Sequence, residues 1–273
     1  MKRLIGLLLC CLILSGCSRH DALAPETIAL VQEEAYTLSD GTAVDLWQTD
    51  IFQDSVYQTQ DGTELLRIPA KVDIAHVYVG SYVYFDTLSE TAQRQIRAYY
   101  AENWPELDIP ALLENAWKDF CSRDDDHPFS AHYAQQDIYP CASNDRIIAY
   151  CIETMIPIES TERGATHVRN EYFCTVFHRE TGEVIGFWDL FSLSKEGTIE
   201  ALARKMDSNR NQYPELKAAL EGSATARLQQ GGIEFCFPKG TLSWSEYDHY
   251  MYLSCDELSD ILHDWAITEI IDE

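Results

Sequence analysis

The order of strand-like and helix-like apolar patterns constrains the fold of this chain more than any other feature of its sequence. From Val44 the apolar residues follow strand spacing, and Asp61-Gly62 is a dipeptide suited to a hairpin turn. The stretch "SYVYFD", residues 81 to 86, indicates another strand. Two helices are predicted next, one from about Ser89 and one from about Asp108.

Strands followed by helices recur in the second half of the chain. The strand-like stretch "RIIAYCIETMIPI" precedes a hairpin whose turn is Thr181-Gly182, and residues 195–206 carry apolar residues at helical spacing. The later predicted elements are helical stretches over 213–222 and 224–230, strands over 233–238 and 250–254, and a closing helix over 256–265 capped by Ser254 or Asp256. This repetition predicts an α+β fold, with antiparallel sheets and packed helices in two β-then-α subdomains.

The first 17 residues have the three parts of a signal peptide. Lys2-Arg3 precedes an apolar stretch from Leu4 to Leu14, and the stretch "LSGC" that ends at Cys17 resembles the lipobox of bacterial lipoproteins. In a helix, such a stretch is too short to cross a hydrocarbon core about 30 Å thick. We therefore expect Cys17 to carry lipid, with palmitate among its acyl chains, and the chain to be anchored on the extracytoplasmic face of the cell membrane. An ordinary secreted protein is the alternative.

Four segments are expected along the chain. Residues 18–39 show little periodicity, which is typical of a tether. The expected segments are the signal peptide and lipobox over 1–17, the tether over 18–39, an N-terminal α+β subdomain over 40–144 and a C-terminal α+β domain over 145–273.

Acidic residues dominate the charge of the chain. There are 45 Asp and Glu against 20 Lys and Arg, which gives a formal net charge of −25. Such a surface repels phosphate backbones, so nucleic acid is not an expected partner. It attracts cationic proteins, although solubility at an anionic cell surface explains the same composition.

Six cysteines follow Cys17, and their pairing is open. An even number permits three disulfides in 15 possible connectivities, while six buried free thiols are an equal alternative. The chain has no C-x-x-C pair, which disfavours a zinc ribbon or a thioredoxin-type site. The six are Cys121, Cys141, Cys151, Cys174, Cys236 and Cys255.

Common catalytic signatures are missing from the sequence. It contains no G-x-S-x-G, H-E-x-x-H, G-x-x-x-x-G-K-[ST] or G-x-G-x-x-G motif. The best metal candidate, Asp124 to His127 together with His132, is interpreted as a solvated acidic loop because consecutive side chains point in different directions. We expect no catalytic residue, no metal and no cofactor.

A ring-rich loop near the C-terminus is the best candidate for a binding surface. The stretch "FCFPKGTLSWSEYDHYMYLS" joins two predicted strands through a loop of about ten residues. Exposed Trp and Tyr give large contact area at low entropic cost and are typical binding anchors. Core packing of the rings is the alternative. The candidate ligand-binding residues are Pro238, Trp244, Tyr247 and Tyr250.

The stretch "FCTVFHRETGEVIGFWDLFS", followed by a helix and then by "GGIEFCFPKGTLSWSEYDHYMYLSCDELSDIL", resembles a known family of extracellular domains. The family is typified by the anti-sigma-V factor RsiV and also accompanies the catalytic domain of the peptidoglycan deacetylase PdaC. The resemblance covers roughly residues 145–265, and the part before it is similar to the companion domain more loosely. The matching positions are Thr181, Gly182, Asp189, Leu190, Phe191, Gly232, Phe235, Phe237, Glu257 and Leu258.

The resemblance implies a binding module. The best-understood relative binds lysozyme through this domain and signals through a cytoplasmic segment joined by a membrane helix. Neither of those parts is seen in this sequence, so an anti-sigma role is not expected. We expect a membrane-anchored, non-catalytic module that binds a lysozyme-like cationic protein or a cell-wall glycan. The alternative is an enzyme that modifies cell-wall polysaccharide, or an accessory domain of one.

Overall fold

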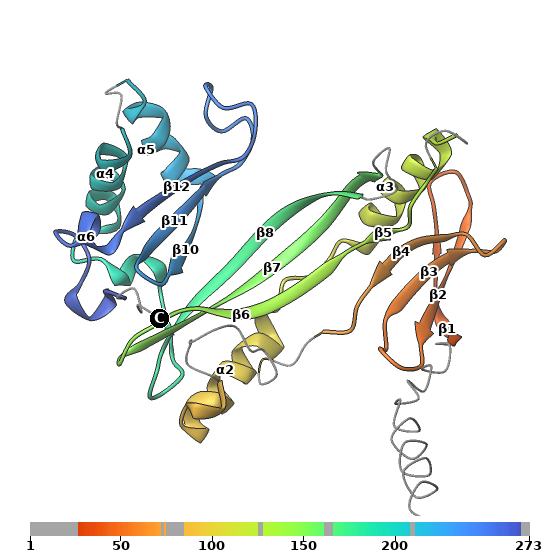
Figure 1. Cartoon of the computed structure of the whole chain (residues 1–273), viewed down its shortest axis with the longest axis horizontal. Coiled ribbons are helices and arrows are strands. Elements are labelled where there is room, and N and C mark those ends of the chain that lie inside the picture. The colour runs from red at the N-terminus through yellow and green to blue at the C-terminus, as the bar shows by residue number, and fades with distance from the viewer. Residues whose placement is uncertain are drawn as a thin grey trace, which may run out of the picture.

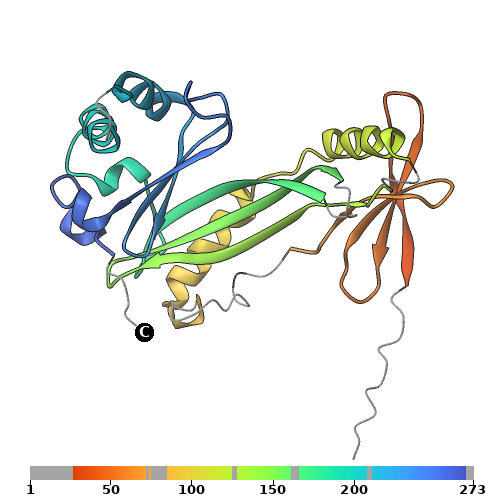
Figure 2. The same ribbon diagram turned by 45° about the horizontal axis from the view of Figure 1, so that its top comes forward.

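Three sheets with packed helices form an elongated molecule in this computed structural model (Figures 1 and 2). The structure describes residues 27–71, 74, 85–124, 128–160, 166–207 and 211–268. An N-terminal sheet lies at one end, a C-terminal sheet lies at the other, and the long strands of a central sheet run between them (Figure 1). The sheets are mostly antiparallel, so the predicted α+β fold class is confirmed.

The N-terminal sheet packs on one helix. Its strands, in spatial order, are β1 (Ile28–Thr37), β2 (Ala43–Thr49), β3 (Ser55–Thr59), β4 (Glu64–Ile68) and β5 (His132–Tyr133). The predicted Asp61-Gly62 turn joins β3 to β4, and the positive φ of Gly62, 88°, is the conformation that favours glycine there. Helix α3 (Ile109–Ser122) begins where predicted, with Asp108 as its N-cap, and buries Leu112 and Leu113 against this sheet.

The N-terminal segment differs from the tether expected over residues 18–39. Residues 18–26 of that tether lie outside the described part of the chain, but β1 is a strand paired antiparallel with β2. Thr27 also donates its N–H to the carboxylate of Asp50, at 3.1 Å, which fixes the start of β1 beside the end of β2. The sequence of β1 alternates weakly, and its strand conformation comes from this pairing rather than from a local pattern.

The central sheet contains the longest strands of the described chain. Its order is β6 (Gln135–Ser143), β7 (Ile147–Ser160), β8 (Thr166–His178) and β9 (Val184–Ile185). Helix α2 (Glu90–Asn103) begins at the predicted cap Ser89 and packs Ile96 and Tyr100 on one face of this sheet. The expected division between residues 144 and 145 falls in the β6–β7 turn, inside one sheet, so the border between the two subdomains needs correction.

The C-terminal unit covers the other face of the central sheet. Its elements are η3 (Phe187–Leu190), α4 (Lys195–Met206), α5 (Tyr213–Gly222), β10 (Thr225–Gln229), β11 (Gly232–Phe237), β12 (His249–Ser254), α6 (Cys255–Leu258) and η4 (Asp264–Ala266). One cluster of buried residues combines this unit with Ala149, Cys151 and Val176 of β7 and β8. Alternate residues of β7 therefore face α2 and the C-terminal unit, which buries both faces of the sheet.

One predicted helix of this unit is wrong, and another is present but shorter than predicted. Residues 225–229 form β10 because they pair with β11, and the positive φ of Gly231, 85°, turns the chain between the two strands. The closing helix ends at Leu258 after a single turn with a capping box between Ser254 and Glu257. Beyond it, the N–H of Ser192 donates to the Ile261 carbonyl at 2.8 Å, so the backbone there pairs with another segment.

The predicted strand over residues 81–86 is only partly described. Residues 81–84 lie outside the described chain, and the 3-10 helix η2 (Phe85–Thr87) follows them. Phe85 is buried in the cluster between α2 and the central sheet.

Candidate functional site

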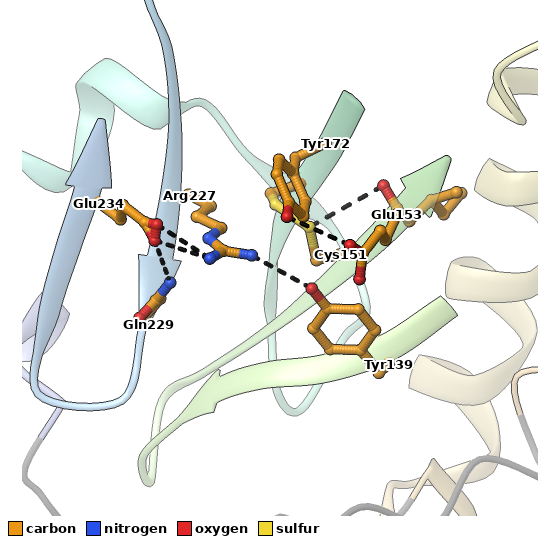
Figure 3. The surroundings of a disulfide bond; sticks show 9 residues. Tyr139, Cys151, Glu153, Tyr172, Arg227, Gln229 and Glu234 are labelled. Atoms are coloured by element: carbon orange, nitrogen blue, oxygen red, sulfur yellow. Dashed lines mark hydrogen bonds and ion pairs between the residues drawn. A yellow bond between two sulfur atoms is a disulfide. The ribbon is translucent and has the colours of Figure 1, made fainter. Parts of the chain in front are cut away.

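Arg227 joins the C-terminal unit to the central sheet. Its guanidinium extends from β10, donates to Glu234 of β11 at 2.7 and 2.9 Å, and reaches the hydroxyl of Tyr139 on β6 at 3.3 Å (Figure 3). It also lies 4.3 Å from the ring centroid of Tyr172 on β8, a cation–π contact. The hydroxyl of Tyr172 in turn hydrogen-bonds to Glu153 at 3.2 Å (Figure 3). This network holds β10 on the face of the central sheet that carries Tyr139 and Tyr172.

Three adjoining cavities follow β8 next to that contact, and we call them together the β8 groove. A cavity of about 540 Å³ lies along β8 from Arg169 to Phe173, and it shares Arg169 and Glu171 with a neighbour of about 520 Å³ that reaches α3. A third, of about 280 Å³, continues along β8 to Cys174 and ends at η3.

The walls of the β8 groove come from distant parts of the chain. Pro105, from the connection between α2 and α3, forms one wall, and its carbonyl accepts a hydrogen bond from Gln136 of β6 at 2.9 Å. Thr225 of β10 and Pro238 lie on the opposite wall. The end of the groove near η3 is apolar, with Phe187 and Trp188 in its lining.

Carboxylates dominate the charged lining of the β8 groove. Glu106, Asp108, Glu171 and Asp248 line it, and Arg169 is the basic residue among the lining residues. The guanidinium of Arg169 is already paired with Glu171 at 2.7 Å, and both side chains are about half exposed. The groove therefore presents a net negative charge to solvent, which favours a cationic ligand.

The four candidate residues of the ring-rich loop do not form one site. Pro238 lines the β8 groove, and Tyr250 lines a small neighbouring cavity beside Arg227. Trp244 packs edge-on against His249, with ring centroids 4.5 Å apart, while Tyr247 has 74% of its surface exposed. The loop thus extends a partly exposed aromatic surface beyond the end of the groove.

Hydrogen bonds fix the conformation of the ring-rich loop. Asp248 accepts from the N–H of Lys239 at 2.7 Å, which closes the base of the loop. Glu215 of α5 accepts from the N–H and the hydroxyl of Ser243 at 3.0 and 2.6 Å. These bonds to the ionised carboxylate lower the pKa of Glu215. Leu242 is buried beneath the loop, so its exposed rings stand on an anchored base.

The acidic stretch that was considered for a metal is only partly described, since residues 125–127 lie outside the described chain. His132 is fully buried in β5, and its Nε2 lies 3.0 Å from a carboxylate oxygen of Asp119. Arg123 pairs with the other oxygen of that carboxylate at 2.7 Å. Within the described residues, no group of three or more His, Cys, Asp or Glu side chains has metal-binding geometry.

One disulfide is present among the described cysteines. Cys151 of β7 and Cys174 of β8 are joined, with their Cα atoms 4.1 Å apart. The other four described cysteines are free thiols: Cys121, Cys141, Cys236 and Cys255. Burial raises the pKa of the Cys141 thiol to about 12. The sequence left the pairing of these cysteines open, and the structure contains one disulfide and four free thiols among them.

The predicted lipid attachment at Cys17 lies outside the described residues. Within the described chain, no helix combines the length and the apolar character needed to cross a bilayer.

Sequence reasoning missed most of the β8 groove. Pro105, Glu171 and Thr225 carry no motif, and they come together only through the packing of α2, β8 and β10. The stretch "RNEYFC", residues 169–174, did carry a signal. It places charged and aromatic residues together in a predicted strand, a combination that is typical of a binding surface.

Comparisons with known proteins return structural neighbours only. No family model matches this chain, and no curated protein matches it. A solved structure of a DUF3298 family member from Bacteroides fragilis is 11% identical, covers 88% of this chain and 93% of its own, and has a TM-score of 0.38. A DUF3298 family protein from Pseudomonas aeruginosa is 10% identical, with coverages of 90% and 99% and a TM-score of 0.33. The structural neighbours of this chain are DUF3298 family proteins, a family named for a domain of unknown function.

Proposed function

We propose that this chain is a non-catalytic binding module, anchored outside the cell through lipid on Cys17, that binds a lysozyme-like cationic protein at the β8 groove. The observation that carries the proposal is the charge of this groove. Its lining contains one arginine, Arg169, which is already paired, and four carboxylates: Glu106, Asp108, Glu171 and Asp248. Carboxylates arranged in this way attract a basic surface and orient it.

Three further observations support the same function. The formal net charge of −25 steers a cationic protein toward the chain from a distance. The exposed ring of Tyr247 gives a contact surface beyond the groove, on a loop that is anchored before any partner arrives. The resemblance of residues 145–265 to the extracellular domain of RsiV agrees with lysozyme as the kind of partner.

Binding of egg-white lysozyme to the purified full chain tests the proposal, with insoluble peptidoglycan as the competing ligand. We expect lysozyme to bind at about 20 mM salt and to bind more weakly at about 500 mM, because the shorter Debye length screens exposed charges. Binding to peptidoglycan alone would reassign the ligand to the cell-wall glycan. Binding to neither at low salt would contradict the proposal.

Two matched double variants locate the site. Glu106→Gln with Glu171→Gln removes two charges from the groove, while Glu180→Gln with Glu196→Gln removes two exposed charges outside its lining. Both change the net charge equally, so only a contact at the groove separates them. We expect the groove variant to bind lysozyme about fivefold more weakly than the control, from about 0.5 kcal/mol for each exposed charge. Equal affinities would place the binding site elsewhere.

The lipid anchor is tested separately by mass spectrometry of the N-terminal peptide from the native protein. We expect a chain that begins at Cys17 and carries acyl groups. An unmodified Cys17, or an intact leader, would contradict the anchored form.

A further inference from the structure

The outer edge of β8 is a free strand edge inside the β8 groove. β9 pairs with β8 only at Val176 and Phe177, so the edge beyond them has no neighbouring strand among the described residues. Free edges of this kind present N–H and C=O groups that pair readily with another chain.

The register of β7 and β8 identifies which backbone groups point outward. In an antiparallel pair, directly opposed residues alternate between hydrogen-bonded pairs, with Cα atoms about 5.5 Å apart, and non-hydrogen-bonded pairs, about 4.5 Å apart. Cys151 and Cys174 are directly opposed at 4.1 Å, so theirs is a non-hydrogen-bonded pair. The N–H and the C=O of Cys174 therefore point away from β7.

Hydrogen bonds at the other end of β8 identify the same set of residues as those whose backbone groups point away from β7. His178 donates its N–H to the Glu183 carbonyl at 2.8 Å, and its own carbonyl accepts from Gly182 at 2.7 Å, both on the side away from β7. Every second residue of β8 from His178 shares this direction, including Cys174, Tyr172 and Asn170. For these three, the structure shows no backbone hydrogen bond to another described residue.

The edge of β8 carries two charged side chains, Arg169 and Glu171, but no proline or lysine between Arg169 and Cys174. The irregularity in the β7–β8 pairing lies outside this stretch, between Pro157 and Glu159 of β7. The Oδ1 atom of Asn170 is buried with no hydrogen-bond partner in the described structure, and the residue lines the groove. The cavity of about 540 Å³ has Pro105 on one face of the sheet and Thr225 on the other, so it reaches the β8 edge from both faces.

We propose that the β8 edge receives an extended, basic segment of a partner protein, which adds to the central sheet as a strand in line with β9. This inference rests on the proposed function and names how the partner is held. Main-chain bonds to Asn170, Tyr172 and Cys174 give affinity, and the walls select side chains. Lys or Arg faces Glu171 and Asp248, while an apolar side chain enters the end formed by Phe187.

Synthetic peptides test the strand pairing without a protein partner. The probe is acetyl-Lys-Val-Lys-Phe-Lys-Val-Lys-amide, fluorescently labelled, and its binding to the purified full chain is followed by anisotropy. In one derivative the N–H groups of residues 2, 4 and 6 are methylated, and in the other those of residues 3 and 5. An added strand turns only one of these sets toward β8. We expect one derivative to bind at least about tenfold more weakly, and the other to stay within about threefold of the parent.

A backbone variant of the protein provides the second arm. Asn170→Pro removes one outward N–H and leaves the β7 ladder intact, whereas Asn170→Ala removes the side chain and keeps the N–H. We expect Asn170→Pro to weaken binding of the parent peptide about tenfold and Asn170→Ala to weaken it less than threefold. If Asn170→Pro does not fold, the methylated peptides decide alone.

The outcomes that would overturn strand addition differ from those that would overturn the proposed function. No binding of the parent peptide, or equal effects of the two methylation patterns, overturns strand addition. Lysozyme binding that depends on Glu106 and Glu171 while the peptides fail leaves the proposed function standing with a different mode of contact.

Discussion

Cys151 and Cys174 lie directly opposite each other on β7 and β8 and are joined by a disulfide, with their Cα atoms 4.1 Å apart. The bond lies between the two long strands that connect the ends of the molecule (Figure 1). It faces the C-terminal unit, where Cys151 is fully buried. The disulfide thus joins β8, whose outer edge faces the β8 groove, to β7.

Removal of the disulfide is expected to destabilise the protein. The bond closes a loop with a sequence separation of 23 residues, for which chain entropy gives about 3 kcal/mol. We predict that the double variant Cys151→Ala with Cys174→Ala loses about that free energy of unfolding, measured by urea denaturation. Cys121→Ala, at an exposed free thiol, is the control and should leave the midpoint unchanged. Equal midpoints for the double variant and the control would show that the bond does not form.

Alkylation should distinguish the free thiols by their burial. Cys121 is exposed, while Cys141 is buried and its pKa is raised to about 12 by desolvation. We predict that iodoacetamide labels Cys121 of the native protein first at about pH 8 and labels Cys141 only after unfolding. Peptide mapping by mass spectrometry gives the order. Rapid labelling of Cys141 in the folded protein would contradict the packing of β6.

The contact of Arg227 should contribute more to stability than an exposed ion pair. The side chains of Arg227 and Glu234 are 20% and 15% exposed, whereas Arg204 and Glu200 are 68% and 44% exposed. We predict that Arg227→Ala costs about 2 kcal/mol, because it removes two hydrogen bonds to the half-buried Glu234 and the donor to Tyr139, while Arg204→Ala costs less than about 0.5 kcal/mol. Similar urea midpoints for both variants would show that this network does not hold β10 on the central sheet.

The anchor of the ring-rich loop should depend on pH. Hydrogen bonds from Ser243 lower the pKa of Glu215 from its ordinary value of 4.5. Because the folded pKa is depressed, the stabilisation is complete above the unfolded pKa and is lost as the pH falls through the folded value. We predict that Glu215→Gln flattens the loss of stability between about pH 5 and about pH 3. Glu221→Gln, on the same helix, is the control, and identical profiles for the two variants would contradict this anchor.

Local sequence patterns predicted the elements whose signals are local. Helices α2 and α3 begin at Ser89 and Asp108 as expected, and Gly62 and Gly182 occupy the expected turns with positive φ. The same reasoning failed for Thr225–Gln229, because only pairing with β11 makes this segment a strand. The residues of a single strand do not determine which strand it pairs with.

The candidate site was predicted only at its margin. Pro238 lies in the β8 groove, while Tyr247 stands outside the groove's lining on an exposed loop. Glu171 and Pro105 come together through tertiary packing, and the free edge of β8 depends on how soon β9 ends. The composition indicated a cationic partner, but the place where such a partner binds can be inferred only from the folded structure.

Amide hydrogen exchange along β8 reports whether a bound partner pairs with the free strand edge. In the free protein, the amides of Glu171 and Phe173, which point to β7, should exchange slowly, and those of Tyr172 and Cys174, which point into the groove, should exchange fast. We predict that saturating egg-white lysozyme slows exchange at Tyr172 and Cys174 and leaves exchange at Glu171 and Phe173 unchanged. Unaltered exchange at Tyr172 and Cys174 in the lysozyme-bound protein would contradict this prediction.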